Sequence, residues 1–315
     1  MKRREFLTRM TASVALAGFG GVGDQLWALA RRRALRPAPV DKHRRIAIST
    51  WSFHNYFRST RDKDFSLPGK MLALLDFPEM IVDRYKVHNF EFVAPHFGST
   101  EASYLAELEG RMRRTHSRLI NIPVDIEEVW AGGGLSDSDK SVRARAVTAV
   151  KKWIDIGRRL GTRSVRCDPG KMNPEHLTPT VESYRELSAY GRSKGVYVII
   201  ENHGGVGSEH PEELVKLFKA VGGNNIGALP DFGNFPDEET RERGLTVLFP
   251  HAHSVCHAKG FEFDPDGNET RFDFRKCVEI SKEAKYAGVY SVEYEGPGDP
   301  YEGVQKVVDE LMRLL

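Results

Sequence analysis

Cysteine is scarce in this chain, with three residues among 315. Their number is odd, and their spacing matches neither a zinc ribbon nor a disulfide framework. Cys167 and Cys256 each end an apolar run, so we expect these two and Cys277 to be buried free thiols. The G-x-S-x-G and P-loop motifs are also missing, so the sequence lacks the signatures of a serine hydrolase and of a P-loop nucleotidase.

A strong charge bias is absent as well. The formal net charge is +2, and 29% charged and 40% hydrophobic residues are ordinary for a globular protein. This balance indicates neither a nucleic-acid partner nor a charged membrane surface. The apolar stretch at residues 10–22 is too short and too rich in glycine to span a membrane comfortably. No later run has the required length, so we expect no stable membrane span.

The first 30 residues have the pattern of an export signal. Basic residues precede the apolar stretch, and Ala28-Leu29-Ala30 offers a cleavage site of the small-x-small type. The pair Arg3-Arg4, followed by Glu-Phe-Leu, resembles a twin-arginine signal peptide and predicts a periplasmic or otherwise exported protein. Cleavage after Ala30 would remove four basic and two acidic residues and lower the net charge from +2 to 0. The alternatives are an uncleaved anchor or a basic N-terminus without a targeting role.

After a basic, proline-containing linker at residues 31–45, short apolar runs alternate regularly with helical patterns. We expect strands at residues 46–51, 89–93, 118–124, 162–167, 196–200, 225–230, 252–256 and 289–292. We expect helices at residues 78–88, 99–117, 138–160, 178–194, 211–221, 237–248, 272–286 and 301–315. Eight such units over residues 46–315 predict an α/β fold, a single (β/α)8 TIM barrel without a second domain. A doubly wound open sheet is the alternative.

One of these runs, Val196–His203, ends abruptly in polar residues. Its apolar part predicts a strand that is buried on both faces, with Glu201 at the C-terminal tip. A buried carboxylate there costs free energy unless it is paired or bound to a metal. Asp231, His257 and Glu293 follow the next three predicted strands, each about one βα unit further along the chain.

In a barrel these four side chains would meet at the C-terminal rim, where such folds place their active sites. Two glutamates, an aspartate and a histidine are natural ligands for a divalent metal. The mixed oxygen and nitrogen donors suit Mn2+, Zn2+, Co2+ or Fe2+, whereas the histidine makes Mg2+ less suitable. The alternative is a metal-free rim held together by ion pairs.

Longer motifs surround these residues and resemble the sugar phosphate isomerase/epimerase superfamily, with its xylose isomerase-like TIM barrel. The resemblance covers residues 46–315 and rests on Ile200-Glu-Asn-His-Gly-Gly205, Pro230-Asp-Phe-Gly-Asn234, Cys256-His-Ala-Lys259 and Ser291-Val-Glu-Tyr-Glu-Gly296. It implies metal binding by Glu201, Asp231, His257 and Glu293. It also implies that Glu201 and Glu293 are the catalytic acid and base groups. The choice of Glu293 over Glu295 as a ligand rests on the resemblance.

A site of this kind supports removal of a proton next to a carbonyl group, because a bound metal stabilises the enediolate that results. Two carboxylates on opposite faces of the substrate can take and return the proton, which gives epimerisation or aldose–ketose isomerisation. We therefore expect a metal-dependent isomerase or epimerase that acts on a keto-sugar, an inosose or a related carbohydrate. The same intermediate can eliminate a leaving group, so a lyase or hydrolase-type enzyme for 3-keto-glycosides is the alternative.

Export favours a substrate without phosphate, because free sugar phosphates are mainly cytosolic. Two further alternatives are an abasic-site nuclease, which would need more ligands and a basic groove, and a non-catalytic sugar-binding protein. The neutral mature charge argues against the nuclease, and the intact carboxylate pair argues against the binding protein. We expect a small-molecule carbohydrate partner, no nucleic acid, and a homo-oligomer, since barrels of this kind often dimerise.

Several nearby residues are candidates for substrate binding. His203 lies two residues beyond Glu201 and would bind substrate hydroxyl groups or stabilise its loop. Lys259 lies two residues beyond His257 and would hold a substrate oxygen or form a salt bridge. Asn234 occupies a position where several relatives have histidine. Trp51 ends the first predicted strand and would stack against a sugar face or fill the core.

The second and fourth strands add two more candidates. Glu91 ends the second strand and would reach the pocket or pair with Arg166 on the fourth strand. Asp168-Pro-Gly170, just beyond the fourth strand, is predicted to be a simple turn.

Overall fold

Eight parallel strands form a closed ring in the computed structural model, which describes residues 41–66 and 69–315. The strands are β1 (Ile46–Ser49), β2 (Asn89–Glu91), β3 (Arg118–Pro123), β4 (Ser164–Arg166), β5 (Tyr197–Glu201), β6 (Ile226–Leu229), β7 (Val255–Gly260) and β8 (Val289–Tyr294). From β1 to β6 each strand pairs with its neighbour in sequence, β7 pairs with β8, and β1 pairs with β8. Bridges from Ala228 to Ala252 and from Asp231 to His257 join β6 to β7. The predicted single (β/α)8 barrel is therefore confirmed, and the open sheet is wrong.

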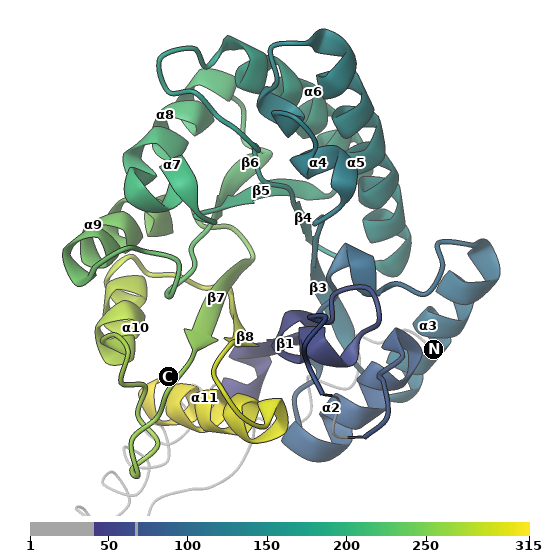
Figure 1. The fold of residues 1–315 in the computed structure, drawn as a ribbon, viewed down its shortest axis with the longest axis vertical. Coiled ribbons are helices and arrows are strands. Elements are labelled where there is room, and N and C mark those ends of the chain that lie inside the picture. The colour runs from purple at the N-terminus through teal and green to yellow at the C-terminus, as the bar shows by residue number, and fades with distance from the viewer. Residues whose placement is uncertain (1–40, 67–68) are drawn as a thin grey trace, which may run out of the picture. The chain divides into compact units, whose positions relative to one another are not determined.

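Helices surround the ring of strands (Figure 1). The longer ones are α2 (Phe77–Tyr85), α3 (Ala102–Arg114), α5 (Lys140–Leu160), α6 (Thr178–Lys194), α8 (Pro211–Val221), α9 (Glu238–Leu248), α10 (Phe274–Glu283) and α11 (Pro300–Leu314). Two short helices, α4 (Glu127–Trp130) and α7 (Gly205–Glu209), lie in the loops that follow β3 and β5. Short 3-10 segments are η1 (Lys42–Arg45), η2 (Thr50–Tyr56), η3 (Leu74–Asp76), η4 (Ala94–His96), η5 (Gly134–Ser136) and η6 (Phe249–His251). No helix among the described residues is long and apolar enough to cross a membrane.

The core has two parts because each strand has an inner and an outer face. The larger part packs the outer faces of the strands against the helices. A small separate cluster of Ala47, Ile120, Ile199, Leu229 and Val255 comes from five different strands. Such a layer of inward-facing side chains fills a barrel and leaves no pore. The three cysteines are free and buried, as expected.

Helix α5 shows how the sequence fixes an element. Its N-cap residue Asp139 accepts a hydrogen bond from the Ser141 amide at 2.7 Å. Its apolar stripe buries Val150 and Ile154, and it ends at Gly161, whose φ of +76° closes the helix in the left-handed conformation.

The ends of three strands differ from the prediction. Strand β7 continues to Gly260 and β8 to Tyr294, so His257, Lys259 and Glu293 lie within strands rather than after them. Strand β1 stops at Ser49, and Trp51 lies in η2. The polar residues in β7 and β8 were interpreted as loop because a strand with inward charges does not show the apolar signal of a buried strand.

The start of the barrel also differs. The predicted signal peptide and residues 31–40 of the linker lie outside the described residues. The rest of the linker belongs to the barrel unit, which begins at Asp41. Lys42 Nζ donates to the Met312 carbonyl oxygen at 2.6 Å, and Arg45 Nε donates to the Gly288 carbonyl oxygen at 2.6 Å. These bonds attach η1 to the last helix and to the start of β8.

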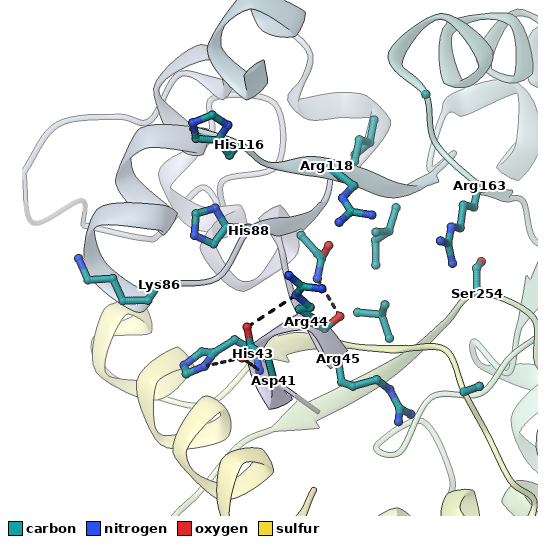
Figure 2. Close-up of a pocket in the computed structure, with 16 residues that line it drawn as sticks. Asp41, His43, Arg44, Arg45, Lys86, His88, His116, Arg118, Arg163 and Ser254 are labelled. Atoms are coloured by element: carbon teal, nitrogen blue, oxygen red, sulfur yellow. Dashed lines mark hydrogen bonds and ion pairs between the residues drawn. The ribbon is translucent and has the colours of Figure 1, made fainter. Parts of the chain in front are cut away.

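The N-terminal face of the barrel carries a basic hollow of about 640 Å3 (Figure 2). Lys86, Arg118 and Arg163 line it, and none of the four predicted metal ligands does. Lys86 is the C-cap of α2, and Arg163 follows the C-cap of α5. Helix C-termini carry partial negative charge, which favours cations at this face. The hollow shares no residue with the carboxylate cluster, which lies at the other end of the strands.

Candidate metal centre

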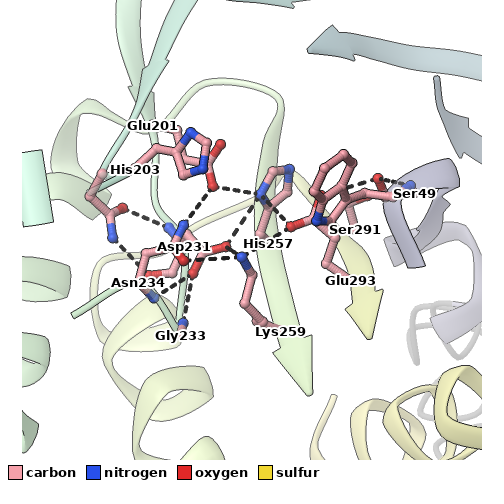
Figure 3. A network of polar contacts seen from close by, with 12 residues as sticks. Ser49, Glu201, His203, Asp231, Gly233, Asn234, His257, Lys259, Ser291 and Glu293 are labelled. Carbon is pink, nitrogen blue, oxygen red and sulfur yellow. Dashed lines mark hydrogen bonds and ion pairs between the residues drawn. The ribbon is translucent and has the colours of Figure 1, made fainter. Parts of the chain in front are cut away.

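The four predicted ligands meet at the C-terminal end of the barrel (Figure 3). Glu201 ends β5, Asp231 follows β6, and His257 and Glu293 lie in β7 and β8. One donor atom from each lies within 4.8 Å of the others, and all four side chains are buried. Strands β5 to β8 thus bring four polar side chains together at one place inside an otherwise apolar barrel.

His257 stands at the middle of this cluster. Its Nε2 lies 3.0 Å from Glu91 Oε2, which fixes the orientation of the ring. Its Nδ1 faces three carboxylate oxygens at once: Glu201 Oε1 at 3.0 Å, Asp231 Oδ2 at 3.3 Å and Glu293 Oε2 at 3.4 Å. A single N–H on Nδ1 cannot satisfy three acceptors. A cation between Nδ1 and the three oxygens would satisfy all of them.

The remaining polar atoms fit a cation in two further ways. Glu201 Oε2 and Asp231 Oδ2 are buried and have no hydrogen-bond partner. The cluster is also short of positive charge. It buries the four carboxylates of Glu91, Glu201, Asp231 and Glu293 against two permanent cations, Arg166 and Lys259. Because Arg166 also pairs with Asp125 and Asp168, the cluster has an excess of negative charge that suits a divalent ion, and the oxygen and imidazole donors match the metals predicted from the sequence.

Asp231 is held by its backbone and by the loop that follows it. The Asn202 side chain brackets its main chain: Oδ1 accepts from the Asp231 amide at 2.8 Å, and Nδ2 donates to the Asp231 carbonyl at 3.1 Å. Asp231 Oδ1 then accepts from the amides of Gly233 and Asn234 at 2.7 and 2.8 Å. These contacts leave Oδ2 directed at the cluster. Asn202 belongs to the Ile200–Gly205 motif, but its role in holding Asp231 is not predicted from the sequence.

Glu201 is kept ionised by its neighbours. Burial alone would raise its pKa, but the charges of His257 and Arg166 hold the pKa well below the usual value. Arg166 Nε lies 3.0 Å from Glu201 Oε2, without the alignment of a hydrogen bond. Asn234 Nδ2 donates to Glu201 Oε1 at 3.0 Å. Arg166 and Asn234, both predicted to bind substrate, therefore hold a carboxylate of the cluster in place.

Glu293 differs from Glu201 in its surroundings. Burial raises the pKa of Glu293 to about 7, against the opposing charges of His257 and Lys259. Ser49 Oγ donates to Glu293 Oε1 at 3.1 Å, so the end of β1 supports this side chain. The two glutamates that the sequence assigns to proton transfer thus sit in unlike electrostatic environments.

Lys259 lies inside the cluster as a buried cation. Its Nζ is 3.4 Å from Asp231 Oδ2, 3.3 Å from Glu293 Oε2 and 3.2 Å from Glu295 Oε1. Trp51 Nε1 donates to the same oxygen of Glu295 at 2.6 Å. Glu295 follows the end of β8 and takes part in this contact, while Glu293 belongs to the potential ligand group. The indole of Trp51 reaches the site through Glu295.

Glu91 lies beneath the site and does not reach the pocket. Its side chain is fully buried, and its Oε1 accepts from Asn121 Nδ2 at 2.6 Å. Its Oε2 accepts from Ser291 Oγ at 2.6 Å and contacts His257. Glu91 forms no ion pair with Arg166, so that alternative is wrong. Both oxygens of Glu91 are engaged by other side chains, and its contact with a substrate stays a prediction. Glu91 is a positioning residue for His257.

Arg166 organises a second acidic group next to the first. Its Nη1 donates to Asp125 Oδ1 at 2.6 Å and to Asp168 Oδ2 at 2.7 Å. Asp168 Oδ2 also lies 2.9 Å from His203 Nδ1. Asp168 is buried and contacts two substrate-binding candidates, Arg166 and His203, so it is more than part of the simple turn that was predicted. Asp125, Asp168 and His203 could hold a metal by composition, but both carboxylates already accept hydrogen bonds from the guanidinium group of Arg166.

Several solved structures resemble this chain in fold. A D-psicose 3-epimerase with D-tagatose from Clostridium cellulolyticum H10 matches with a TM-score of 0.65 at 15% identity, over 86% of this chain and 99% of that one. The IOLI protein with a bound zinc atom gives a TM-score of 0.63 at 15% identity, over 86% and 97%. The 3-keto-D-glucoside 4-epimerase from E. coli gives 0.59 at 14% identity, over 85% and 99%.

Comparison of the sequence alone gives a family and no closer relative. No curated protein matches the chain by sequence. A scan against protein families matches residues 82–314, which include seven of the eight strands and all four residues of the carboxylate and histidine cluster. The chain belongs to the xylose isomerase-like TIM barrel family.

Proposed function

We propose that this protein is a metal-dependent isomerase or epimerase that acts on a keto-sugar, an inosose or a related carbohydrate by removing a proton next to the carbonyl group. One observation carries the proposal: Glu201 and Glu293 converge with Asp231 around Nδ1 of His257, inside a buried site with an excess of negative charge. The sugar epimerases among the structural neighbours support this class of substrate.

Each residue of the site has a distinct task in this proposal. Glu201, Asp231, His257 and Glu293 would hold the ion, which when bound supplies the positive charge that stabilises an enediolate. Glu201 takes the proton at a carboxylate oxygen, and Glu293 delivers a proton on the other side. Lys259, whose ammonium group is held between carboxylates, donates to a substrate oxygen. Burial excludes water from the proton that is moved.

The predicted export signal bears on the substrate. A protein in the periplasm would meet few free sugar phosphates, so the proposed substrate carries no phosphate. Zinc fits the oxygen and nitrogen donors, and one structural neighbour carries a zinc atom; Mn2+, Co2+ and Fe2+ fit the same donors. The nuclease alternative needs several ions, whereas Arg166 occupies the second acidic group.

Carboxamide variants of the two glutamates test this function. Glu201→Gln and Glu293→Gln keep the shape of the side chain but cannot accept a proton. We expect each to lower turnover of an accepted keto-sugar at least about 100-fold, the usual size of a lost acid or base. Asn234→Ser, which changes a neighbour that is not assigned to proton transfer, should lower turnover far less. Normal turnover by both glutamine variants with metal bound would overturn the proposal.

A further inference from the structure

A side pocket of about 370 Å3 opens beside the carboxylate and histidine cluster. It shares Glu201 and His203 with the site described above. Its other walls come from the loops after β3, β4 and β5 and from the start of α8. Trp130, Pro169, Met172, Val206 and Leu214 supply its apolar side chains. The carbohydrate chemistry proposed above needs none of these residues.

Trp130 gives the side pocket an unusual surface. Its exposed fraction is 43%, and only Met71 joins it as an exposed large hydrophobic residue in the described part of the chain. An exposed indole gains none of the free energy that burial of its apolar surface would give. An apolar group bound against it would supply that burial. The indole contacts the His203 ring in a T-shaped arrangement with centroids 5.7 Å apart. Figure 3 shows His203 next to Glu201, so the aromatic surface reaches the reacting centre.

The loop that carries Trp130 is locked in place. Gly134 has a φ of +60°, and a Cβ there would lie 1.9 Å from the Val129 carbonyl oxygen. A Cβ on Gly170 would lie 2.4 Å from the Gly133 carbonyl oxygen, so the loops after β3 and β4 touch backbone to backbone. Ser136 Oγ also donates to the Pro169 carbonyl oxygen at 2.6 Å. The side pocket is therefore preformed and does not depend on a ligand to order it.

Apart from the exposed Lys171, the ionisable side chains of the side pocket are already engaged. Asp168 Oδ1 accepts from the Glu201 amide at 3.3 Å, and Asp168 Oδ2 serves Arg166 and His203. On the opposite wall, Gly204 and Gly205 present no side chain, and a Cβ on either would meet no atom within 4 Å. A second sugar unit would find few free hydrogen-bond partners here, whereas a flat apolar group would be matched by indole, proline and methionine.

We propose that the natural substrate is a keto-sugar that carries an aromatic aglycone, with the sugar at the metal cluster and the aglycone in the side pocket against Trp130. The inference rests on the proposed function, and it names the substrate class that the preformed apolar space selects. A free monosaccharide would leave that space and the indole solvated. The proposal applies equally to epimerisation of the sugar and to loss of the aglycone.

The test compares two substrates that differ only in the group at the anomeric oxygen: 4-nitrophenyl and methyl 3-keto-β-D-glucoside. The metal-loaded protein should have a kcat/KM roughly tenfold to a hundredfold higher for the nitrophenyl compound. Trp130→Ala should remove most of this preference, while Trp130→Phe retains much of it. Met71→Ala, which truncates the other exposed apolar residue, should leave the preference unchanged.

A second measurement keeps the side pocket testable without turnover. Binding of 4-nitrophenyl β-D-glucoside and methyl β-D-glucoside to the metal-loaded protein is followed by calorimetry for the parent chain and for Trp130→Ala. If neither keto-glucoside reacts but the nitrophenyl compound binds through Trp130, the proposed function fails and the aglycone pocket stands. If keto-sugars react without an aryl preference, or if Trp130→Ala weakens both compounds equally, the aglycone proposal is overturned and the function stands. Tighter binding of a disaccharide, in which a second glucose replaces the nitrophenyl group, would also overturn the aglycone proposal.

Discussion

Glu91 Oε2 and His257 Nε2 lie 3.0 Å apart, although 166 residues separate them in the chain. The contact joins β2 to β7 across the inside of the barrel. It leaves the other ring nitrogen of His257 facing the three carboxylates that complete the cluster. A buried carboxylate behind a histidine ligand is a common way to set its tautomer and its basicity.

Replacing Glu91 with glutamine should therefore weaken metal binding without touching a ligand. We expect the Kd for Zn2+ or Mn2+ to rise about 10- to 100-fold, because the amide carries no charge and one of its hydrogens would face a donor. Competition with a chelator of known affinity measures the change. The control is Glu279→Gln, an exposed glutamate on α10. Equal affinity in both variants would show that Glu91 does not position His257.

Lys259→Met should separate metal binding from turnover. Its ammonium lies 3.3 Å from Glu293 Oε2 and 3.4 Å from Asp231 Oδ2, so its removal takes away a charge that repels a cation. We expect tighter metal binding, with turnover lowered about tenfold or more because the substrate oxygen loses its donor.

Metal titration and steady-state kinetics on the same preparation show this split. Lys306→Met, which removes an exposed lysine of α11, serves as the control. Loss of metal affinity in Lys259→Met would mean that the lysine supports the structure of the site rather than the substrate.

Two glycines offer a matched test of the locked loop beneath the side pocket. Gly134 and Gly161 both have positive φ, at +60° and +76°, but only Gly134 is crowded, with the Val129 carbonyl oxygen 1.9 Å from a built Cβ. Gly161→Ala should cost about 1–2 kcal/mol of unfolding free energy from backbone strain alone. Gly134→Ala should cost at least about 3 kcal/mol and weaken nitrophenyl glucoside binding. Equal losses in urea unfolding would contradict a tightly packed loop.

His96 should make the barrel sensitive to acid. Burial, with a smaller effect of His54, lowers the pKa of His96 to about 3, and the ring stacks on Phe57 between the hydroxyl groups of Thr50 and Thr60. The unfolded chain has a histidine pKa near 6.5, so below that pH it binds the proton that the folded ring refuses. Stability is therefore complete above about pH 6.5 and falls as the pH is lowered towards 3.

The size of this effect is measurable at moderate pH. Between pH 7 and pH 5 the free energy of unfolding should fall by about 2 kcal/mol because of this residue. Urea unfolding of metal-free protein at both pH values gives the loss, and His96→Gln should show a smaller one. If the free energy of unfolding of His96→Gln had the same pH dependence as that of the parent, the prediction of a neutral, buried His96 would be contradicted.

The sequence predicted the barrel because its signals are local and repeated. Apolar runs, helical stripes and a regular spacing of one βα unit each depend on neighbouring residues. The same spacing predicts that Glu201, Asp231, His257 and Glu293 meet at one rim of the barrel. The strand ends were less accessible, because Lys259 and Glu293 are polar residues inside strands, and polar residues ordinarily mark loops.

Contacts between distant strands could not be predicted in the same way. The pairing of Glu91 with His257, and of Arg166 with Glu201 rather than Glu91, depends on how strands shift relative to each other around the ring. No single segment records that shift. One signal was available: Asn121 interrupts the apolar run of β3, and a polar residue at such a position commonly has a buried partner, here Glu91.

The most direct test of the central claim is the deuterium content of a keto-sugar or inosose recovered after incubation with this protein in D2O. Protein loaded with Zn2+ or Mn2+ should introduce deuterium at the carbon next to the carbonyl group, as seen by proton NMR. Protein stripped with a chelator, and loaded Glu201→Gln, should introduce essentially none. Exchange that persists without metal, or its absence with the loaded protein across a panel of keto-sugars and inososes, would contradict the account.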